Sequence, residues 1–406
     1  MLKNIINYLL DRKITNFSIL DIGSYALKYA KVKIKNSNFY IEEKRKVSTK
    51  SISKGLILDG KLFEEELKLL LDISEKEYIY IIFPNSNFLI KGEEEVDIPY
   101  DLGFSSLIEK NIFKDIYFKY KEDKEYFLPE LYTSHLCPHT FILDNQEVKN
   151  ILNLTGRFIE VKAFPFFLKK SYTIETLKSL LKNKKILNYT SQAVMLAASF
   201  LKEKQDFENN NLIISFSSSG TEGIFLKQGF LAWSYFDPKF SIKAILKKLS
   251  KFFDLPYIEV ENYFVKEGIK VLRRQSYTLR INRRSFRTYK IINAILILMR
   301  NIIKNFIYLV SKKGYKISKI YITGYPLKFR DFKEILYDKT FLGLSLKLNP
   351  WEMKVDDFDF KTIYAFIDYL NLVLKNNYPL DINLEPYEIL NMEEESESAP
   401  QKVGHV

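Results

Sequence analysis

The first stretch of the sequence that could do chemistry is a turn of small polar residues near the N-terminus. The apolar run that starts at Phe17 ends at Asp21, Gly23 and Ser24 follow, and apolar alternation returns up to Val32. This pattern predicts a strand, a tight turn and a second strand. Because glycine lets a backbone approach a ligand closely, the turn amides can point at a phosphate, and Asp21 can hold Mg²⁺ through water. The alternative is an ordinary hairpin with a polar tip.

A second turn of the same kind lies in the middle of the chain. It follows the apolar run 212–214 and leads through a further strand to a turn at 227–229, after which 230–235 is expected to be a strand. A strand-turn-strand plan that recurs after about two hundred residues indicates an internal duplication. The groups in this turn that could bind phosphate are the hydroxyls and amides of Ser215, Ser217, Ser218, Ser219, Gly220 and Thr221.

The composition is that of a globular protein. The chain has 406 residues, of which 47% are hydrophobic and 28% charged, which is enough for two or more domains. We expect no signal peptide and no membrane span, and we interpret the apolar run 291–299 as a buried helix. The single cysteine, Cys137, fits a reducing cytoplasm. Its flanking histidines, His135 and His139, have a spacing that matches no common zinc module.

The net charge of +12 has two possible origins. One is a lysine- and isoleucine-rich composition spread along the chain; the other is a functional basic surface. The one dense basic run extends from Arg273 to Lys290 and is interleaved with aromatic residues. Such a run can bind nucleic acid, contact a membrane or protein surface, or form a solvated face. No known nucleic-acid module surrounds it, and we expect no nucleic-acid partner.

Hydrophobic periodicity predicts the elements that must position the two turns. An amphipathic helix is expected at the N-terminus, over 1–13, and strands are expected at 38–47, 78–83 and 319–324. Further helices are expected at 63–71, 146–153, 174–187, 191–204, 241–253, 291–312 and 362–374.

Several motifs resemble those of the actin-like ATPases, and among them the family of the pilus-assembly protein PilM and the cell-division protein FtsA. Asp21-Ile22-Gly23-Ser24 followed by Leu27-Lys28 resembles the first phosphate motif of this family, with bulky Tyr25 where Ser or Thr is usual. The phrase Gly55-Leu56-Ile57-Leu58-Asp59-Gly60, the helix after it and the strand ending at Pro84 resemble PilM at matching places. The resemblance covers about residues 17–375.

The resemblance implies an α/β, actin-like fold: two RNase H-like domains facing a nucleotide cleft, with a small inserted α+β subdomain. The domain bounds that follow are 1–16 for an N-terminal amphipathic segment; 17–84, 172–208 and 360–376 for the first actin-like domain; 85–171 for the inserted subdomain; 209–240 and 315–359 for the second domain core; 241–314 for its helical subdomain; and 377–406 for a partly disordered tail.

The later nucleotide motifs depart from the family pattern. The second phosphate motif of the family begins with Asp and Gly, and Ser215 and Ser217 stand there instead. Lys266 matches a helix that contributes to the base pocket, but the glutamate expected three residues earlier is absent. Gly324-Tyr325 matches the adenosine motif, in which the family has two glycines. A tyrosine there either prevents the backbone from lying against the nucleotide or stacks on the base.

The function implied by the resemblance is that of a cytoplasmic adaptor for a type IV pilus or a related secretion or competence machine. It would dock to an inner-membrane partner of PilN type at the inner face of the cell membrane, and it could form a homo-oligomer. ATP with Mg²⁺, if bound, would act as a conformational ligand; at most weak ATPase activity is expected. The alternatives are an FtsA-like cell-division adaptor and a small-molecule kinase of the same superfamily.

The C-terminal tail contains a phrase that resembles the peptide of the expected partner. In the family, PilN carries Ile-Asn-Leu-Leu-Pro, and here Ile382, Asn383, Leu384 and Pro386 surround Glu385. One hypothesis is that the tail occupies the partner groove as a tethered competitor; the alternative is a chance match. Residues 391–406 are acidic and then polar, which predicts disorder.

Overall fold

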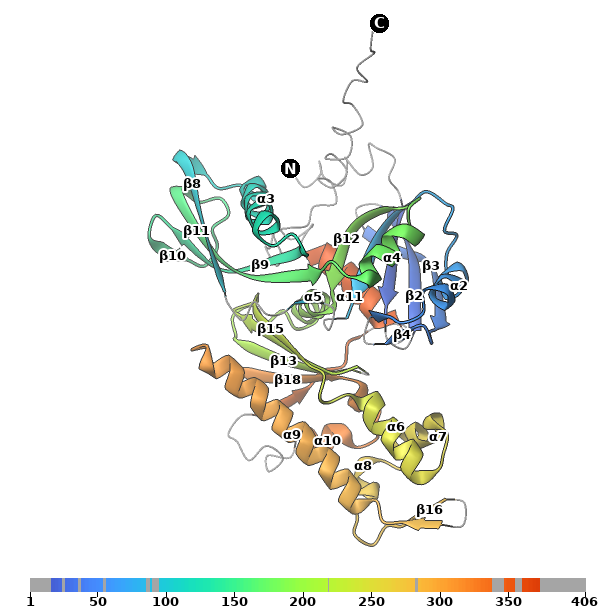
Figure 1. The fold of residues 1–406 in the computed structure, drawn as a ribbon. Coiled ribbons are helices and arrows are strands. Elements are labelled where there is room, and N and C mark those ends of the chain that lie inside the picture. The colour runs from blue at the N-terminus through green and yellow to red at the C-terminus, as the bar shows by residue number, and fades with distance from the viewer. Residues whose placement is uncertain are drawn as a thin grey trace, which may run out of the picture. The chain divides into compact units, whose positions relative to one another are not determined.

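The computed structural model describes residues 16–23, 26–35, 38–53, 56–84, 88–89, 95–217, 219–281, 284–337, 347–354 and 360–372. The expected N-terminal helix, Ser24, Tyr25, Ser218 and the tail phrase lie outside these residues. The chain divides into two compact units (Figure 1): unit 1 comprises Met1–Ala198 and Asp359–Val406, and unit 2 comprises Ser199–Phe358.

Unit 1 is built on a five-stranded sheet of order β3-β2-β1-β6-β12. The first three strands are antiparallel and the last two run parallel to β1. Their apolar runs are buried, as expected for a sheet covered on both faces. The strands are β1 (Asn16–Ile22), β2 (Ala26–Lys35), β3 (Asn38–Ser48), β6 (Tyr78–Phe83) and β12 (Lys185–Ser191).

Helices pack on this sheet and a short two-stranded sheet lies beside it. In α2, the Asp59 side chain accepts hydrogen bonds from the amides of Lys61 and Leu62, which caps the helix. The Phe366 ring of α11 packs on the Tyr80 ring of β6, with 4.8 Å between their centres. The elements are β4 (Ile52–Ser53), β5 (Leu56–Ile57), α2 (Gly60–Lys68), α4 (Tyr172–Leu180), α5 (Gln192–Lys204), which crosses the unit boundary, and α11 (Lys361–Leu370).

A second sheet of unit 1 lies in the expected inserted region. Its order is β10-β9-β11-β7, with β8 paired to β11. Asn188 of β12 joins it to the first sheet, because its amide donates to the Ser134 carbonyl at 3.3 Å and its side-chain oxygen accepts from the Tyr132 hydroxyl at 3.2 Å. The elements are β7 (Phe88–Leu89), β8 (Val96–Leu107), α3 (Lys110–Phe127), β9 (Leu131–Leu143), β10 (Gln146–Val148) and β11 (Thr155–Lys169).

Unit 2 repeats the arrangement of the first sheet of unit 1. Its five strands have the order β15-β14-β13-β18-β19, with three antiparallel strands followed by two parallel ones. This confirms the internal duplication predicted from the two turns. The strands are β13 (Asn211–Phe216), β14 (Thr221–Lys227), β15 (Phe230–Asp237), β18 (Lys319–Gly324) and β19 (Leu348–Pro350).

The helices of unit 2 include α9 (Tyr289–Lys312), the longest helix among the described residues. One stripe of α9 is buried, and Phe306 on this stripe contacts Trp233 and Tyr235 of β15. By length and composition α9 is apolar enough to cross a membrane, with 33% of its apolar window buried. The other elements are α6 (Ile242–Phe253), α7 (Tyr257–Lys266), α8 (Ile269–Leu272), β16 (Leu279–Ile281), β17 (Arg284–Phe286), η2 (Tyr325–Lys328) and α10 (Phe332–Tyr337).

Two of the expected helices are wrong in part or in full. The stretch expected to be a helix over 146–153 holds no helix: Gln146–Val148 form β10, because Asp144 and Asn145 both adopt positive φ (48° and 69°) and turn the chain back on β9. The helix expected over 174–187 ends at Leu180, and the chain then forms β12. Ile186, Tyr189 and Thr190 favour a strand, and pairing with buried β6 decides the outcome.

Candidate functional site

The turn between β1 and β2 carries a buried ion pair. Asp21 and Lys28 are cross-strand partners, and Lys28 Nζ lies 3.0 Å from Asp21 Oδ2. The Asp21 side chain is fully buried, yet its Oδ1 has no hydrogen-bond partner among the residues that the structure describes. Because buried polar atoms normally have partners, this oxygen can accept a bond from water, including water held by Mg²⁺. The geometry therefore fits the role predicted for Asp21.

Gly23 is required by the turn itself. Its amide donates to the Ala26 carbonyl at 3.2 Å, and a Cβ built on Gly23 would lie 2.9 Å from that oxygen. A larger residue would force the turn apart, whether or not a phosphate binds there. Asp21, Gly23 and Lys28 thus lie together at one end of the sheet.

The second turn satisfies its own polar groups. The Ser217 hydroxyl donates to the Gly220 carbonyl at 2.9 Å and accepts from the amides of Ser219 and Gly220 at 3.3 and 3.2 Å. The Ser217 and Ser219 hydroxyl oxygens are 3.3 Å apart. These amides are the donors predicted to bind phosphate, so Ser217 competes with a phosphate for them.

The remaining residues predicted around this turn have structural partners. The Thr221 hydroxyl is buried and donates to the Phe240 carbonyl at 3.1 Å. A Cβ on Gly220 would lie 2.4 Å from the Phe236 ring, so packing alone requires glycine there. Ser215, which stands where the family has Asp, is buried within β13. The turn brings these residues together, but the hydroxyls of Ser217 and Thr221 donate to carbonyls of the protein.

Glu222 is a buried carboxyl beside this turn that the sequence analysis did not single out. It pairs with Ser215 across β13 and β14, and burial raises its pKa to about 8, against a hydrogen bond from Ser234 that lowers it. At neutral pH Glu222 is therefore mostly protonated, and a neutral carboxyl is a poor ligand for Mg²⁺. The sequence signal is a glutamate within the apolar part of the strand Thr221–Lys227.

Gly324, at the end of β18, approaches the neighbouring strand rather than open space. Its φ is +100°, and a Cβ there would lie 2.3 Å from the carbonyl oxygen of Phe216, its register partner on β13. Both features exclude other residues. The close approach that the resemblance assigns to a nucleotide is thus also required by strand packing.

Tyr325 is held by the helix that the resemblance assigns to the base pocket. Its hydroxyl is hydrogen-bonded to Glu261 and Tyr257 of α7, and burial raises its pKa well above the ordinary value for tyrosine. Its ring makes an edge contact with Phe329, 5.9 Å between centres, and Lys328 lies over it. Lys266 is at the end of α7, where its carbonyl accepts from Arg330 at 3.1 Å. Tyr325 therefore links η2 to α7.

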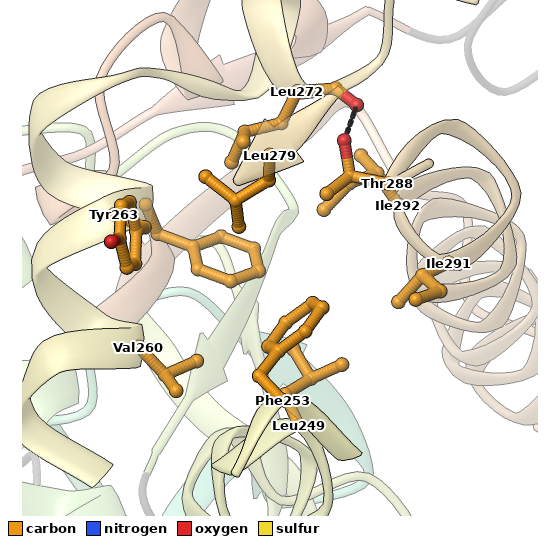
Figure 2. Close-up of a pocket in the computed structure, with 10 residues that line it drawn as sticks. Leu249, Phe253, Val260, Tyr263, Leu272, Leu279, Thr288, Ile291 and Ile292 are labelled. Carbon is orange, nitrogen blue, oxygen red and sulfur yellow. Dashed lines mark hydrogen bonds between the residues drawn. The ribbon is translucent and has the colours of Figure 1, made fainter. Parts of the chain in front are cut away.

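The helical part of unit 2 also encloses an apolar cavity between α6, α7, α8, β16 and α9 (Figure 2), and it admits no more than a water-sized molecule. Thr288, the polar residue at its edge, donates its hydroxyl to the Leu272 carbonyl at 2.6 Å. The lining has no charged group, so it does not fit a nucleotide. Its residues are Leu249, Phe253, Val260, Tyr263, Phe264, Leu272, Leu279, Thr288, Ile291 and Ile292.

The two halves of the predicted site differ in how well they fit ATP and Mg²⁺. In unit 1, Asp21 and Lys28 offer a carboxylate oxygen without a described partner and a cation for phosphate. In unit 2, Ser217 occupies the turn amides and Tyr325 fills the position of the second glycine. The described part of the second turn itself contains no carboxylate, and that of Asp237, the cross-strand partner of Thr221, accepts a hydrogen bond from the Lys239 amide at 2.8 Å. The donor set therefore fits Mg²⁺ and phosphate in unit 1 and does not fit the family pattern in unit 2.

Comparison with known proteins identifies the fold. No family model and no curated protein matches the sequence. Among solved structures, the PilM-PilN type IV pilus biogenesis complex matches with a TM-score of 0.58 and 15% identity, over 89% of this chain and 99% of that one. The chain therefore has an actin-like fold similar to that of PilM, as predicted.

Two further solved structures match over most of their length. MreB5 of Spiroplasma citri bound to AMPPNP has a TM-score of 0.46 and 10% identity, covering 89% of this chain and 97% of that one. The ethanolamine utilization protein EutJ of Carboxydothermus hydrogenoformans has a TM-score of 0.44 and 11% identity, covering 91% and 98%.

Proposed function

We propose that this chain is a cytoplasmic adaptor of a type IV pilus or a related secretion or competence machine. It docks to the cytoplasmic segment of an inner-membrane partner of PilN type and thereby acts at the inner face of the cell membrane. In this proposal the two actin-like units serve as a binding platform whose conformation is set by its partners.

The observation that carries this proposal is the match to the PilM–PilN complex along almost the whole of both chains. At 89% of this chain, the match takes in more than the two five-stranded sheets. It is consistent with the second sheet of unit 1, which the sequence resemblance assigned to a PilM/FtsA-type insertion.

The chemistry of the second turn argues against turnover of ATP. Phosphoryl transfer depends on groups that position Mg²⁺ and orient the nucleophile. The described side chains at this turn and beside it are buried Ser215, Ser217, which is hydrogen-bonded within its own turn, Glu222, which is mostly protonated, and Asp237, which faces Thr221 across β14 and β15 and accepts a hydrogen bond from the Lys239 amide at 2.8 Å. We therefore assign no catalytic residue.

Nucleotide, where it binds, acts as a ligand that biases the conformation. Asp21 would hold Mg²⁺ through water, and Lys28 and the turn at Gly23 would contact phosphate. The bound nucleotide and Mg²⁺ would hold these residues together through their charge and would not be hydrolysed. A nucleotide shifts a conformational equilibrium only to the extent that it binds one conformation more tightly than the other. A weakly bound nucleotide therefore shifts it little.

The alternatives are an FtsA-like division adaptor and a kinase for a small molecule. Both share the fold, so fold similarity alone does not separate them from the proposal. The kinase alternative requires an ionised carboxylate near the second turn, where Ser215 stands. The division alternative predicts that a PilN-type peptide is not recognised.

The proposal is tested by measuring peptide retention and phosphate release on one preparation of the full chain. A peptide containing the PilN-type phrase is immobilised, with a scrambled peptide of the same composition as control. The adaptor proposal predicts retention on the first peptide alone and phosphate release no faster than in buffer with ATP and Mg²⁺. Phosphate release without retention on the peptide would support the kinase instead. If the chain shows neither phosphate release nor retention, the division adaptor is the remaining alternative.

A further inference from the structure

Positive charge is concentrated in one part of unit 2. Between Gly268 and Arg330 the sequence has sixteen lysines and arginines and not one aspartate or glutamate. Since the whole chain has a net charge of +12, the remainder of the chain is net negative. A general richness in lysine does not exclude acids from so long a stretch, so this segregation points to a surface with a partner of opposite charge.

The outer face of α9 combines this charge with exposed apolar side chains. Spacings of three and four residues place the exposed residues on one stripe, opposite the stripe that packs on the sheet. Among them Ile297, Leu298 and Tyr308 are 49%, 44% and 61% exposed. The stripe comprises Lys290, Ala294, Ile297, Leu298, Asn301, Lys304, Asn305, Tyr308 and Lys312; we call it the α9 outer face. At 1.5 Å per residue, α9 is about 36 Å long.

The β16–β17 hairpin lies at the N-terminal end of α9 (Figure 1). Arg280 and Arg287 are exposed there, beside Lys290. Phe286 of β17 packs on the half-exposed ring of Phe252 from α6, with 5.6 Å between ring centres. The hairpin thus repeats the combination of cations and apolar groups.

The cations of this surface are not used in ion pairs within the described part of the chain. Lys270 pairs with Glu334 and Lys319 with Asp206, and both lie outside the α9 outer face. Arg280, Arg287, Lys290, Lys304 and Lys312, in contrast, have no acidic partner among the described residues. Their charge is available to a ligand.

We propose that the α9 outer face and the β16–β17 hairpin bind the surface of a bilayer that contains anionic lipids. The lysines and arginines would contact headgroup phosphates, and Ile297, Leu298 and Tyr308 would enter the boundary between headgroups and acyl chains. A nucleic acid would satisfy the cations but leave the apolar residues between them against a polar backbone. A lipid surface satisfies both, which is why we favour it.

The proposed lipid contact does not rest on the proposed function. It depends on residues of unit 2 alone, and it would hold α9 along the membrane plane. Because each basic residue near an anionic surface adds to the attraction and salt screens it, several exposed cations are sufficient for weak, reversible and salt-sensitive binding.

Flotation of the full chain with lipid vesicles tests the proposal. One set of vesicles is pure phosphatidylcholine and the other contains about 30 mol% phosphatidylglycerol. The chain should float with the anionic vesicles alone and dissociate as salt rises from about 0.1 M to about 0.5 M. The double variant K304E/K312E should lower the partition coefficient about tenfold or more. Equal binding to both kinds of vesicle, or binding to neither, would overturn the proposal.

Matched controls separate a specific surface from total charge and hydrophobicity. K61E/K182E reverses two exposed lysines of unit 1 and changes the net charge equally, so it should float like the wild type. Replacing Ile297 and Leu298 with serine should reduce flotation about fivefold, while the same change at the more exposed Leu58 and Leu69 should not. Equal losses in test and control variants would contradict the assignment.

Two further outcomes name rival occupants. In the first, the chain binds a DNA duplex, K304E abolishes this binding, and the chain does not float with vesicles. This outcome would assign the surface to nucleic acid and overturn the lipid proposal. An acidic peptide of residues 388–397 that inhibits flotation would show that the peptide and the anionic vesicles bind the same surface. This outcome would support the lipid proposal. Peptide retention by the partner site should be unchanged in K304E/K312E, so this proposal and the proposed function fail separately.

Discussion

Lys28 Nζ lies 3.0 Å from Asp21 Oδ2 across the first hairpin, and the two residues are direct cross-strand partners at the end of the sheet. The carboxylate is fully buried while the lysine is partly exposed. The pair therefore keeps a charged oxygen beside a tight turn without leaving it uncompensated.

Removing the lysine should destabilise the fold because it strands a buried charge. Lys28→Met is expected to lower the free energy of unfolding by about 2–4 kcal/mol. Lys33→Met is the matched control, since Lys33 of the same strand β2 pairs with Glu42 of β3 at 3.4 Å with both side chains exposed; its cost should be under about 1 kcal/mol. Urea unfolding measures both, and equal costs would show that the Asp21 pair is not buried in solution.

Gly324 should tolerate no side chain. Gly324→Ala adds a Cβ 2.3 Å from the Phe216 carbonyl oxygen at a φ of +100°, so we expect a loss of about 3 kcal/mol or more. Gly314→Ala is the control: its φ of +82° is similarly positive but nothing lies within 4 Å of the added atom, so about 1 kcal/mol is expected. Thermal unfolding compares the two. A milder effect at Gly324 would contradict the strand packing described above.

Glu222 should make stability depend on pH. Its folded pKa is raised to about 8 by burial, whereas an unfolded glutamate titrates near 4.3. Between about pH 4.5 and 8 the folded state keeps a proton that the unfolded state has lost, so the free energy of unfolding falls as pH rises, by at most about 1.4 kcal/mol per pH unit. Below this window the effect vanishes.

The Glu222→Gln variant isolates this contribution. Its free energy of unfolding should lack the fall, so the difference from wild type should change steadily from pH 5 to pH 8 in urea titrations. Glu175→Gln, at an exposed position on α4, should follow the wild type at every pH. Parallel curves for wild type and Glu222→Gln would mean that the carboxyl is ionised in the fold.

Tyr325 should limit nucleotide affinity. Since its hydroxyl is bound by Glu261 and Tyr257 of α7, we propose that it fills the base position instead of stacking on adenine. Tyr325→Gly should therefore raise the affinity for ATP with Mg²⁺ in calorimetric titration, by about fivefold. Tyr325→Phe keeps the ring and should leave affinity unchanged. A loss of affinity in the glycine variant would show that the ring stacks on the base.

The tail should compete with the partner. If the phrase from Ile382 to Pro386 occupies the partner groove, deletion of 378–406 should raise the affinity for a PilN-type peptide, because a tethered competitor is removed. Alanine at Ile382 and Leu384 in the full chain should have the same effect. Unchanged affinity in fluorescence titration of either variant would make the phrase a chance match.

The sequence was sufficient for the parts of the fold governed by local pattern. Apolar runs broken by glycine and serine predicted both β-hairpin openings, and their recurrence predicted the duplication now seen in the two five-stranded sheets. Sequence failed where tertiary pairing decides: Lys185–Ser191 is a strand because β6 offers a parallel edge, which no local periodicity encodes.

The candidate site divides in the same way. The pairing of Asp21 with Lys28 follows from hairpin register, and the substitution at Ser215 is visible in the sequence. The hydrogen bonds of Ser217 to its own turn, and the bonds of α7 to Tyr325, depend on rotamers and on contacts distant in the chain. The pKa of Glu222 likewise reflects burial that only the folded sheet provides.

Partner docking is the central feature of the proposed adaptor, and calorimetric titration of a PilN-type peptide into the full chain measures it directly. We predict saturable binding at one peptide per chain with a dissociation constant on the order of micromolar, and no heat from a scrambled peptide. An absence of heat from both peptides at about 100 μM chain, with the chain folded by circular dichroism, would contradict the adaptor function.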